Sequence, residues 1–226
     1  MKLGVLLSGG KDSLFACYRA MEKEEVVCLI TVVSRNDESY MFHTPNIHLA
    51  ALQAEAAGLP LVEVETAGEE ERELDDLQRA IALARDEHGI EGVVTGAILS
   101  VYQATRVQRI CAGLGLWCFN PLWHTDQAAY MEALLAAGFR VLIAGVFAEP
   151  FDETWLGREI DADTLAELRR LADRYRISLT GEGGELETFV TDAPFFTQRI
   201  VVDEASVTYR NHNGRYTIRQ ARLVAK

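Results

Sequence analysis

The chain has 226 residues, 49% of them hydrophobic and 25% charged, which is typical of a globular protein with a buried core. A net charge of −12 disfavours non-specific binding to nucleic acid, because Lys and Arg must neutralise the phosphates. The four cysteines form no Cys-x-x-Cys pair, so neither a zinc knuckle nor a thioredoxin motif is indicated. Without a signal sequence or an apolar run of about 20 residues, we expect a cytoplasmic protein with reduced thiols.

A strand, a glycine turn and a helix are predicted in direct succession at the amino terminus. The apolar run from Leu3 to Leu7 indicates a short buried strand, and Ser8-Gly9-Gly10 indicates a tight turn. Asp12 and Ser13 favour the first turn of a helix over about 12–24. Backbone N–H groups and the positive end of the helix dipole would meet beside Lys11. The stretch therefore predicts an anion site.

Strands and helices alternate through the first half of the chain. Further strands are expected at 26–33, 61–64, 92–96 and 116–119, and helices at 46–57, 69–88 and 102–112. Near-continuous apolar strands between helices indicate an α/β fold with an open parallel sheet of five strands and helices on both faces. Ligands bind such sheets beyond the carboxyl ends of the strands, where the stretches 8–13, 34–46 and 96–102 are expected to meet.

The second half follows a different pattern. We place a boundary near residue 121, which predicts an ATP-binding domain at 1–121 and a smaller α+β substrate domain at 122–226. Helices are expected at 125–137 and 163–175, a strand at 139–145, and irregular structure at 147–160. Two alternating strands, 199–209 and 216–224, flank Asn211-His212-Asn213-Gly214, which is a hairpin signal.

A glycine-rich acidic segment runs from Gly181 to Thr188. Its three carboxylates, Glu182, Glu185 and Glu187, repel one another unless a cation is nearby. We therefore expect a functional loop that binds a metal or an ammonium nucleophile. An exposed acidic turn is the alternative.

Several side chains near the expected ligand edge each have two interpretations. Asp12 is a candidate Mg²⁺ ligand or a helix-capping residue. Arg106 would either stabilise phosphate charge or be a solvated helix charge. His43 and His48 are either substrate contacts or surface polarity, and their separation does not suit two metal ligands on one helix face.

The hexapeptide from Ser8 to Ser13 indicates one class of phosphate loop. Because Lys11 is followed by Asp12, it is not a Walker A loop, and it lacks the third glycine of a dinucleotide fingerprint. It resembles the pyrophosphate loop of the ATP pyrophosphatases, which split ATP between the α and β phosphates to adenylate a substrate. The loop alone would also fit tRNA thiolases, argininosuccinate synthetase or NAD synthetase.

Five motifs in chain order together resemble the diphthine–ammonia ligase family, over nearly the whole chain. They are the segments 8–13, 40–48, 96–100, 121–123 and 181–190. The resemblance implies an adenine-nucleotide α-hydrolase-like domain and ATP-dependent amidation of the diphthine carboxylate on translation elongation factor 2. The carboxylate would attack the α-phosphate of ATP, and ammonia would then displace AMP. Mg²⁺, free ammonium and a homodimer are also implied.

The same resemblance implies roles for individual residues. Catalysis is assigned to Lys11, Asp12, Glu182, Glu185 and Glu187; nucleotide binding to Ser8, Gly9, Gly10, Lys11, Asp12, Ser13, Val33, Gly96 and Arg106; metal binding to Asp12; and substrate binding to His43, Asn46, His48, Tyr102, Trp123 and Thr188. Val101 departs from the family, which usually has Asp before the tyrosine. Another acceptor, such as a small carboxylate or a tRNA base, therefore stays open, as does a non-catalytic adenine-nucleotide sensor.

Overall fold

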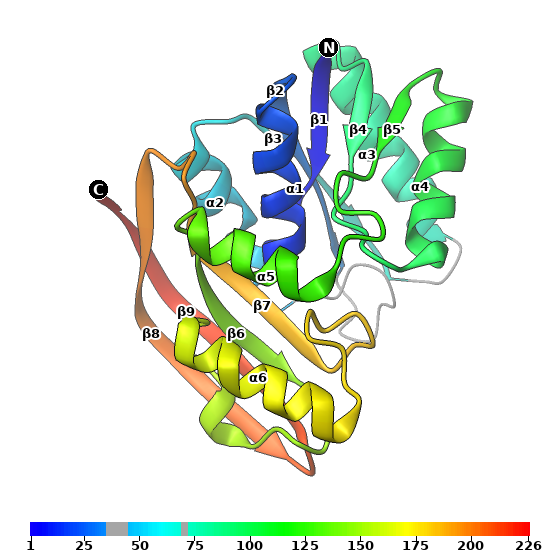
Figure 1. The fold of residues 1–226 in the computed structure, drawn as a ribbon. Helices are drawn as coiled ribbons and strands as arrows, with labels where there is room; N and C mark the ends of the chain where they lie inside the picture. Colours follow the sequence, from blue (N-terminus) through cyan, green and yellow to red (C-terminus); the bar gives the residue numbers. More distant parts are fainter. Residues whose placement is uncertain (35–44, 69–71) are drawn as a thin grey trace.

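The fold consists of a parallel sheet and an antiparallel sheet that lie side by side in a computed structural model (Figure 1), which describes residues 1–34, 45–68 and 72–226. Within these residues the first sheet contains β1 (Lys2–Leu6), β2 (Glu25–Ser34), β3 (Leu61–Thr66), β4 (Gly92–Val94) and β5 (Trp117–Phe119). Their order is β3-β2-β1-β4-β5, and every neighbouring pair is parallel. The predicted five-stranded parallel sheet is confirmed.

Helices cover both faces of this sheet, as predicted (Figure 1). They are α1 (Lys11–Met21), α2 (Ala50–Ala57), α3 (Arg72–His88) and α4 (Val101–Gly113). Residues of α3 and α4 pack in one apolar cluster with Ile30 and Val62, whereas α1 and α2 share another with Val5 and Leu29. Neighbouring residues of a strand point to opposite faces, which is why β2 contributes to both clusters.

Two elements were predicted to extend further toward the expected ligand-binding edge of the sheet than they do in the structure. The helix expected from Asn46 begins instead with a 3₁₀ turn, η1 (Ile47–Leu49), because Asn46 itself has a left-handed backbone, with φ +67°. The strand expected at 92–96 ends at Val94. Thr95 and Gly96 therefore belong to the loop that leaves the sheet.

The strands β1 and β4 are neighbours in the sheet, but their connections run in opposite directions. The chain passes from β1 to β2 on one side and from β4 to β5 on the other. A crevice opens at such a switch point, beyond the carboxyl ends of the two strands. The loops at 7–10 and 95–100 lie at this point, as the sequence indicates.

The second sheet is antiparallel, with strand order β7-β6-β9-β8. Its strands are β6 (Arg140–Val146), β7 (Leu186–Asp192), β8 (Gln198–Arg210) and β9 (Asn213–Ala225). The same half of the chain contains the helices α5 (Gln127–Ala136), η2 (Glu153–Trp155) and α6 (Ala162–Tyr175). The predicted hairpin is confirmed, with left-handed backbone at Asn211 and His212. Asp161 caps α6, because its Oδ1 accepts from the Thr164 N–H at 2.8 Å.

A single apolar cluster joins the two sheets. It includes Phe15 on α1, Tyr130 on α5 and Phe139 before β6. The ring of Phe15 lies 5.2 Å from that of Tyr130 and 5.5 Å from that of Phe139, centroid to centroid. The division at residue 121 therefore stays a prediction, since the core is shared between the two halves.

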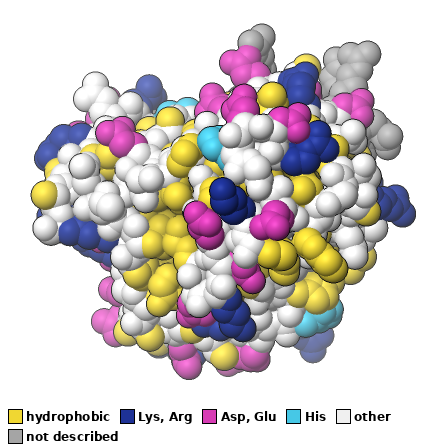
Figure 2. All heavy atoms as spheres, turned by 90° about the horizontal axis from the view of Figure 1, so that it is seen from above, with side chains coloured by type: hydrophobic (Ala, Val, Ile, Leu, Met, Phe, Trp, Pro, Cys, Tyr) yellow, Lys and Arg dark blue, Asp and Glu magenta, His cyan; other side chains and the backbone are white. Residues whose placement is uncertain are grey.

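The surface mixes charges of both signs. On the face in Figure 2, acidic and basic side chains are interspersed, with hydrophobic atoms showing between them. Among the described residues, no helix is long and apolar enough to span a bilayer.

Gly96 lets the loop after β4 lie directly against the start of α1. A Cβ at this position would come within 2.6 Å of the Asp12 carbonyl carbon and 2.7 Å of the Ser13 nitrogen. We expect Gly96→Ala to lower the free energy of unfolding by about 1–3 kcal/mol, measured by urea denaturation, because two backbones must separate. Gly113→Ala is the control, since a Cβ there meets nothing within 4 Å. Equal stability of both variants would contradict this packing.

Candidate active site

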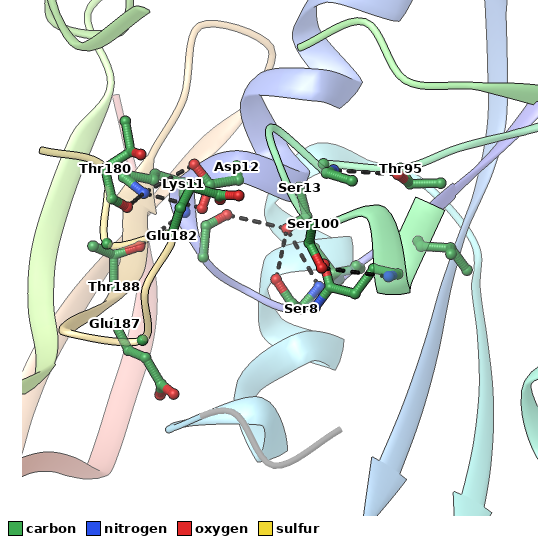
Figure 3. Close-up of a pocket in the computed structure, with 18 of the residues that line it drawn as sticks. Ser8, Lys11, Asp12, Ser13, Thr95, Ser100, Thr180, Glu182, Glu187 and Thr188 are labelled. Atoms are coloured by element: carbon green, nitrogen blue, oxygen red, sulfur yellow. Dashed lines mark hydrogen bonds and ion pairs between the residues drawn. The ribbon is translucent and has the colours of Figure 1, made fainter. Parts of the chain in front are cut away.

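A cavity of about 520 Å³ lies at the switch point, within the roughly 300–1,000 Å³ of small-molecule sites. Ile30, Val32, Leu77 and Val107 form an apolar part of its wall. The glycine loop, the loop after β4 and the acidic segment form a polar part (Figure 3). The cavity thus joins segments from both halves of the chain.

The glycine loop presents backbone N–H groups at the start of α1. Gly9 has φ +82°, and Gly10 is the N-cap residue with extended backbone. The Ser13 hydroxyl accepts from the Ser8 hydroxyl at 3.1 Å and from the Ser8 N–H at 3.3 Å. These bonds close the loop over the helix N-terminus, where the helix dipole favours an anion.

One of these N–H groups is already bonded within the protein. The Lys11 N–H donates to Oγ1 of Thr188 at 3.1 Å. Thr188, which we expected to bind substrate, therefore contacts the glycine loop directly, and its carbonyl oxygen lies 3.3 Å from the position of a Cβ on Gly10. A side chain larger than hydrogen at Gly10 would press on β7.

The ammonium group of Lys11 lies in a polar network with Asp12 and Thr180 (Figure 3). Only 1% of this residue is exposed. Its Nζ donates to the two carboxylate oxygens of Asp12 at 2.9 and 3.0 Å and to the Thr180 carbonyl at 2.6 Å. The hydroxyl of Tyr130 donates to Oδ1 of Asp12 at 2.8 Å. Burial and the charge of Asp12 hold the pKa of Tyr130 well above 10, so Tyr130 remains a donor.

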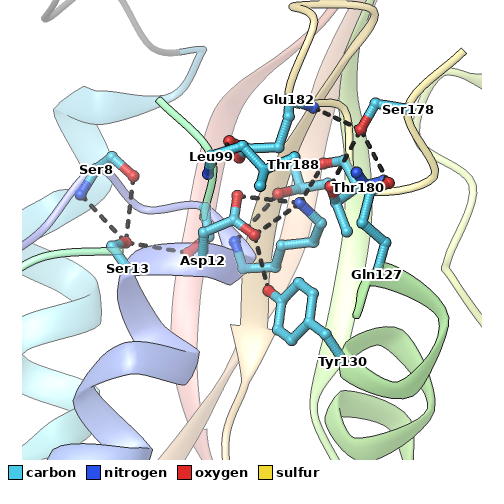
Figure 4. A network of polar contacts seen from close by, with 12 residues as sticks. Ser8, Asp12, Ser13, Leu99, Gln127, Tyr130, Ser178, Thr180, Glu182 and Thr188 are labelled. Carbon is cyan, nitrogen blue, oxygen red and sulfur yellow. Dashed lines mark hydrogen bonds and ion pairs between the residues drawn. The ribbon is translucent and has the colours of Figure 1, made fainter. Parts of the chain in front are cut away.

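Glu182 connects the acidic segment to the loop after β4. Its Oε2 accepts from the Leu99 N–H at 2.9 Å, and Figure 4 shows it beside Asp12. Burial raises the pKa of Glu182, and the charge of Asp12 acts in the same direction. Glu182 therefore brings a second carboxylate to the polar end of the cavity.

Glu185 has a different position from its neighbours. Its Oε1 accepts from the Ser178 N–H at 3.0 Å, and its Oε2 accepts from the Gly183 N–H at 2.9 Å. The residue is absent from the cavity wall among the described residues. Its carboxylate holds the turn of the acidic segment, so the structure does not support the catalytic role we expected.

Glu187 does line the cavity, on a side away from Lys11 and Asp12 (Figure 3). Its Oε2 is buried and has no hydrogen-bond partner among the described residues. Burial raises the pKa of Glu187 to about 7, although the charge of Arg215 opposes this shift. A carboxyl group with this pKa can accept or release a proton near neutral pH.

Two residues expected to bind substrate instead hold β9. Asn46 donates from Nδ2 to the Tyr216 carbonyl at 3.0 Å and accepts at Oδ1 from the Ile218 N–H at 2.8 Å. The ring nitrogen Nε2 of His48 lies 3.0 Å from the Ile218 carbonyl. Asn46 is buried and both ends of its amide bond β9, so its assignment to substrate binding is corrected, whereas that of His48 stays a prediction.

The other predicted site residues differ in whether they line the cavity. Val32 lines it in place of Val33, because adjacent residues of a strand face opposite sides. Tyr102 lines it as expected, and the guanidinium of Arg106 stacks on the Tyr102 ring at 3.2 Å from the centroid. Trp123 packs against His124 instead. His43 lies outside the described residues.

Two residues of the Lys11 network were not predicted from the sequence. Tyr130 lies within an apolar helix and looks like an ordinary core residue, and the carbonyl of Thr180 carries no side-chain signal. Both become visible only when the two halves of the chain are placed together. A motif search along the sequence has no means of finding them.

We expect Glu187→Gln to change how stability depends on pH. In the wild type the unfolded chain loses this proton near pH 4.5, whereas the folded chain keeps it to about pH 7. Wild-type stability therefore falls relative to Glu187→Gln between these values, and the difference is constant above them. Urea denaturation at pH 4, 5.5, 7 and 8 measures it, with exposed Glu204→Gln as control. A difference independent of pH would contradict the buried carboxyl.

Two domain models match the chain almost end to end. The diphthamide synthase N-terminal domain matches residues 1–118 and the diphthamide synthase C-terminal domain matches residues 126–224. The glycine loop falls in the first and the acidic segment in the second.

Curated relatives agree with these matches. A protein of Bos taurus named diphthine–ammonia ligase is 33% identical over 92% of this chain and 85% of its own length. One of the same name from Rattus norvegicus is 34% identical over 90% of this chain and 83% of its own. A solved structure described as a predicted subunit of tRNA methyltransferase from Methanocaldococcus jannaschii is 17% identical, with a TM-score of 0.44 over 85% of this chain and 97% of its own. By its domain matches and its curated relatives, the chain belongs to the diphthine–ammonia ligase family.

Proposed function

We propose that the chain uses ATP to amidate the diphthine carboxylate on translation elongation factor 2, with AMP and pyrophosphate as the other products. The family to which it belongs supports this reaction, since relatives carry the name diphthine–ammonia ligase. One observation of the structure carries the proposal. The helix N-terminus and the acidic segment line one cavity, and Lys11 bonds Thr180, the residue before that segment and 169 positions further along the chain.

ATP fits the two kinds of cavity wall. The apolar part around Ile30, Val32 and Leu77 suits a nucleobase, and the N-terminus of α1 suits phosphates. Among the described residues, no three His, Cys, Asp or Glu side chains gather as a metal site. Mg²⁺ would therefore take most of its ligands from the phosphates and Asp12, and it would supply positive charge that screens them.

The first step joins two anions. A carboxylate oxygen of the acceptor attacks the α-phosphorus, the bond from that phosphorus to the bridging oxygen breaks, and pyrophosphate leaves. The N–H groups of the glycine loop reduce the repulsion between the anions. Lys11 lines the cavity and would contribute its charge when a phosphate replaces Asp12 as its partner, and Asp12 would then be available to hold Mg²⁺. The pairing with Asp12 keeps the buried ammonium stable until the nucleotide arrives.

The second step needs ammonia in its neutral form. Ammonium must lose a proton before its nitrogen attacks the acyl carbon and AMP leaves with the electron pair of the broken bond. Among the described residues, Glu182 and Glu187 are the two glutamates on the cavity wall, and both have a raised pKa. Glu187 is the better proton acceptor near pH 7, because its Oε2 has no hydrogen-bond partner among the described residues.

We further propose that the protein works as a homodimer in the cytoplasm. The family resemblance supports the homodimer. An acceptor that belongs to the translation machinery supports the cytoplasm. Sedimentation equilibrium tests the dimer, since the chain mass is 25.1 kDa.

The reaction is tested with ATP, Mg²⁺, ammonium and diphthine-modified elongation factor 2. We expect AMP and a loss of about one dalton from the factor, because OH is replaced by NH₂. Lys11→Ala and Asp12→Ala should each lower AMP formation at least about a hundredfold, because the first removes the ammonium charge at the phosphates and the second removes the carboxylate that would hold Mg²⁺. Circular dichroism checks the fold. AMP without amidation would indicate another acceptor, and nucleotide binding without AMP would indicate a sensor.

The proton-accepting role of Glu187 is tested with a second nucleophile. Glu187→Gln should form AMP but amidate the factor at least about tenfold more slowly with ammonium. Hydroxylamine is largely unprotonated at neutral pH, so it should give the hydroxamate at nearly the wild-type rate. Glu204→Gln is the matched control. An equal loss with both nucleophiles would remove Glu187 from proton transfer.

A further inference from the structure

Gln53, on α2, joins the glycine loop to the second sheet. Its side chain is fully buried, with 0% exposure. Its Nε2 donates to the carbonyl of Gly9 at 3.0 Å and to the carbonyl of Val190 at 2.9 Å. The Val190 N–H also donates to the Gly9 carbonyl, at 3.0 Å. The Gly9 carbonyl therefore has two donors, one from α2 and one from β7.

The orientation of the Gln53 amide follows from these bonds. With its oxygen and nitrogen exchanged, Oε1 would face two carbonyl oxygens and repel both. In the observed orientation Oε1 is buried without a hydrogen-bond partner among the described residues. It lies 3.1 Å from the position of a Cβ on Gly9, so a side chain there would press against it. Burying an acceptor without a partner costs free energy. The two hydrogen bonds that Nε2 donates therefore contribute more than this cost.

Fixing the Gly9 carbonyl also fixes the next N–H group. The carbonyl of Gly9 and the N–H of Gly10 belong to one planar trans peptide, in which they point in opposite directions. Gly10 lines the cavity. Holding the Gly9 oxygen toward Gln53 and Val190 therefore turns the Gly10 N–H away from them.

We propose that Gln53 is a positioning residue, which aims the Gly10 N–H at the phosphates of bound ATP without touching the nucleotide. This inference rests on the proposed function, because it takes ATP as the ligand of the glycine loop. Thr188 does not substitute for Gln53, since it bonds the Lys11 N–H rather than the Gly9 carbonyl.

The test compares ATP binding by calorimetry in the wild type, Gln53→Met and Ala54→Gly, without acceptor. Methionine keeps the shape of the side chain but donates no hydrogen bond. We expect the Kd for ATP to rise about tenfold, because one to two buried bonds are lost, and the Gly10 N–H to exchange faster with solvent by NMR. Ala54→Gly is the control for stability alone, because it weakens the same helix and leaves both bonds intact.

Gln53→Glu provides a second variant. Its carboxylate faces two carbonyl oxygens, so ATP binding relative to wild type should be weakest at pH 8 and recover as the carboxyl gains a proton that it can donate. Gln53→Met should show no such recovery. This pH dependence distinguishes a hydrogen-bonding role from a loss of shape.

The outcomes separate the two proposals. If the wild type does not bind ATP, the proposed function fails and this inference fails with it. If the wild type binds ATP and Gln53→Met binds it equally well, only the inference is overturned. A loss of binding in Ala54→Gly equal to that in Gln53→Met, at equal stability, would overturn it as well.

Discussion

The bond between the Val190 N–H and the Gly9 carbonyl joins the edge of one sheet to a turn of the other. By sequence, the glycine loop belongs to the parallel sheet, since it joins β1 to α1. Its shape nevertheless depends on β7, which contributes Val190 and the hydroxyl of Thr188. The acidic segment leads directly into β7, so one strand positions both polar walls of the cavity. Neither half of the chain builds this site by itself.

The charge of Lys11 is paired within the protein itself. Lys11 is buried, and a buried ammonium is stable only when it is paired and hydrogen-bonded. Asp12, Thr180 and Tyr130 together meet that need. These partners come from three separate parts of the chain. Any anion that binds the lysine must therefore compete with an internal partner.

Local chemistry made much of the site predictable. The glycine loop, its place at the switch point and the involvement of Glu182 follow from residues close together in the chain. The positions of Val32 and Val33 could not be told apart, because both are apolar in a strand buried on both faces. Glu185 and Glu187 also look alike in sequence, and only the fold of the turn separates them. Asn46, Tyr130 and Gln53 act through bonds to residues more than 100 positions away, which no local pattern reports.

The edge position of β7 has a consequence for the solution behaviour of the protein. A bare edge strand offers unpaired N–H and C=O groups to strands of other molecules and promotes aggregation. Here Gly9 and Gln53 occupy part of that edge. The glycine loop thus also covers part of an edge strand that would otherwise be open to other molecules. Damage that releases the loop would expose this strand, so loss of activity and loss of solubility should appear together in this protein.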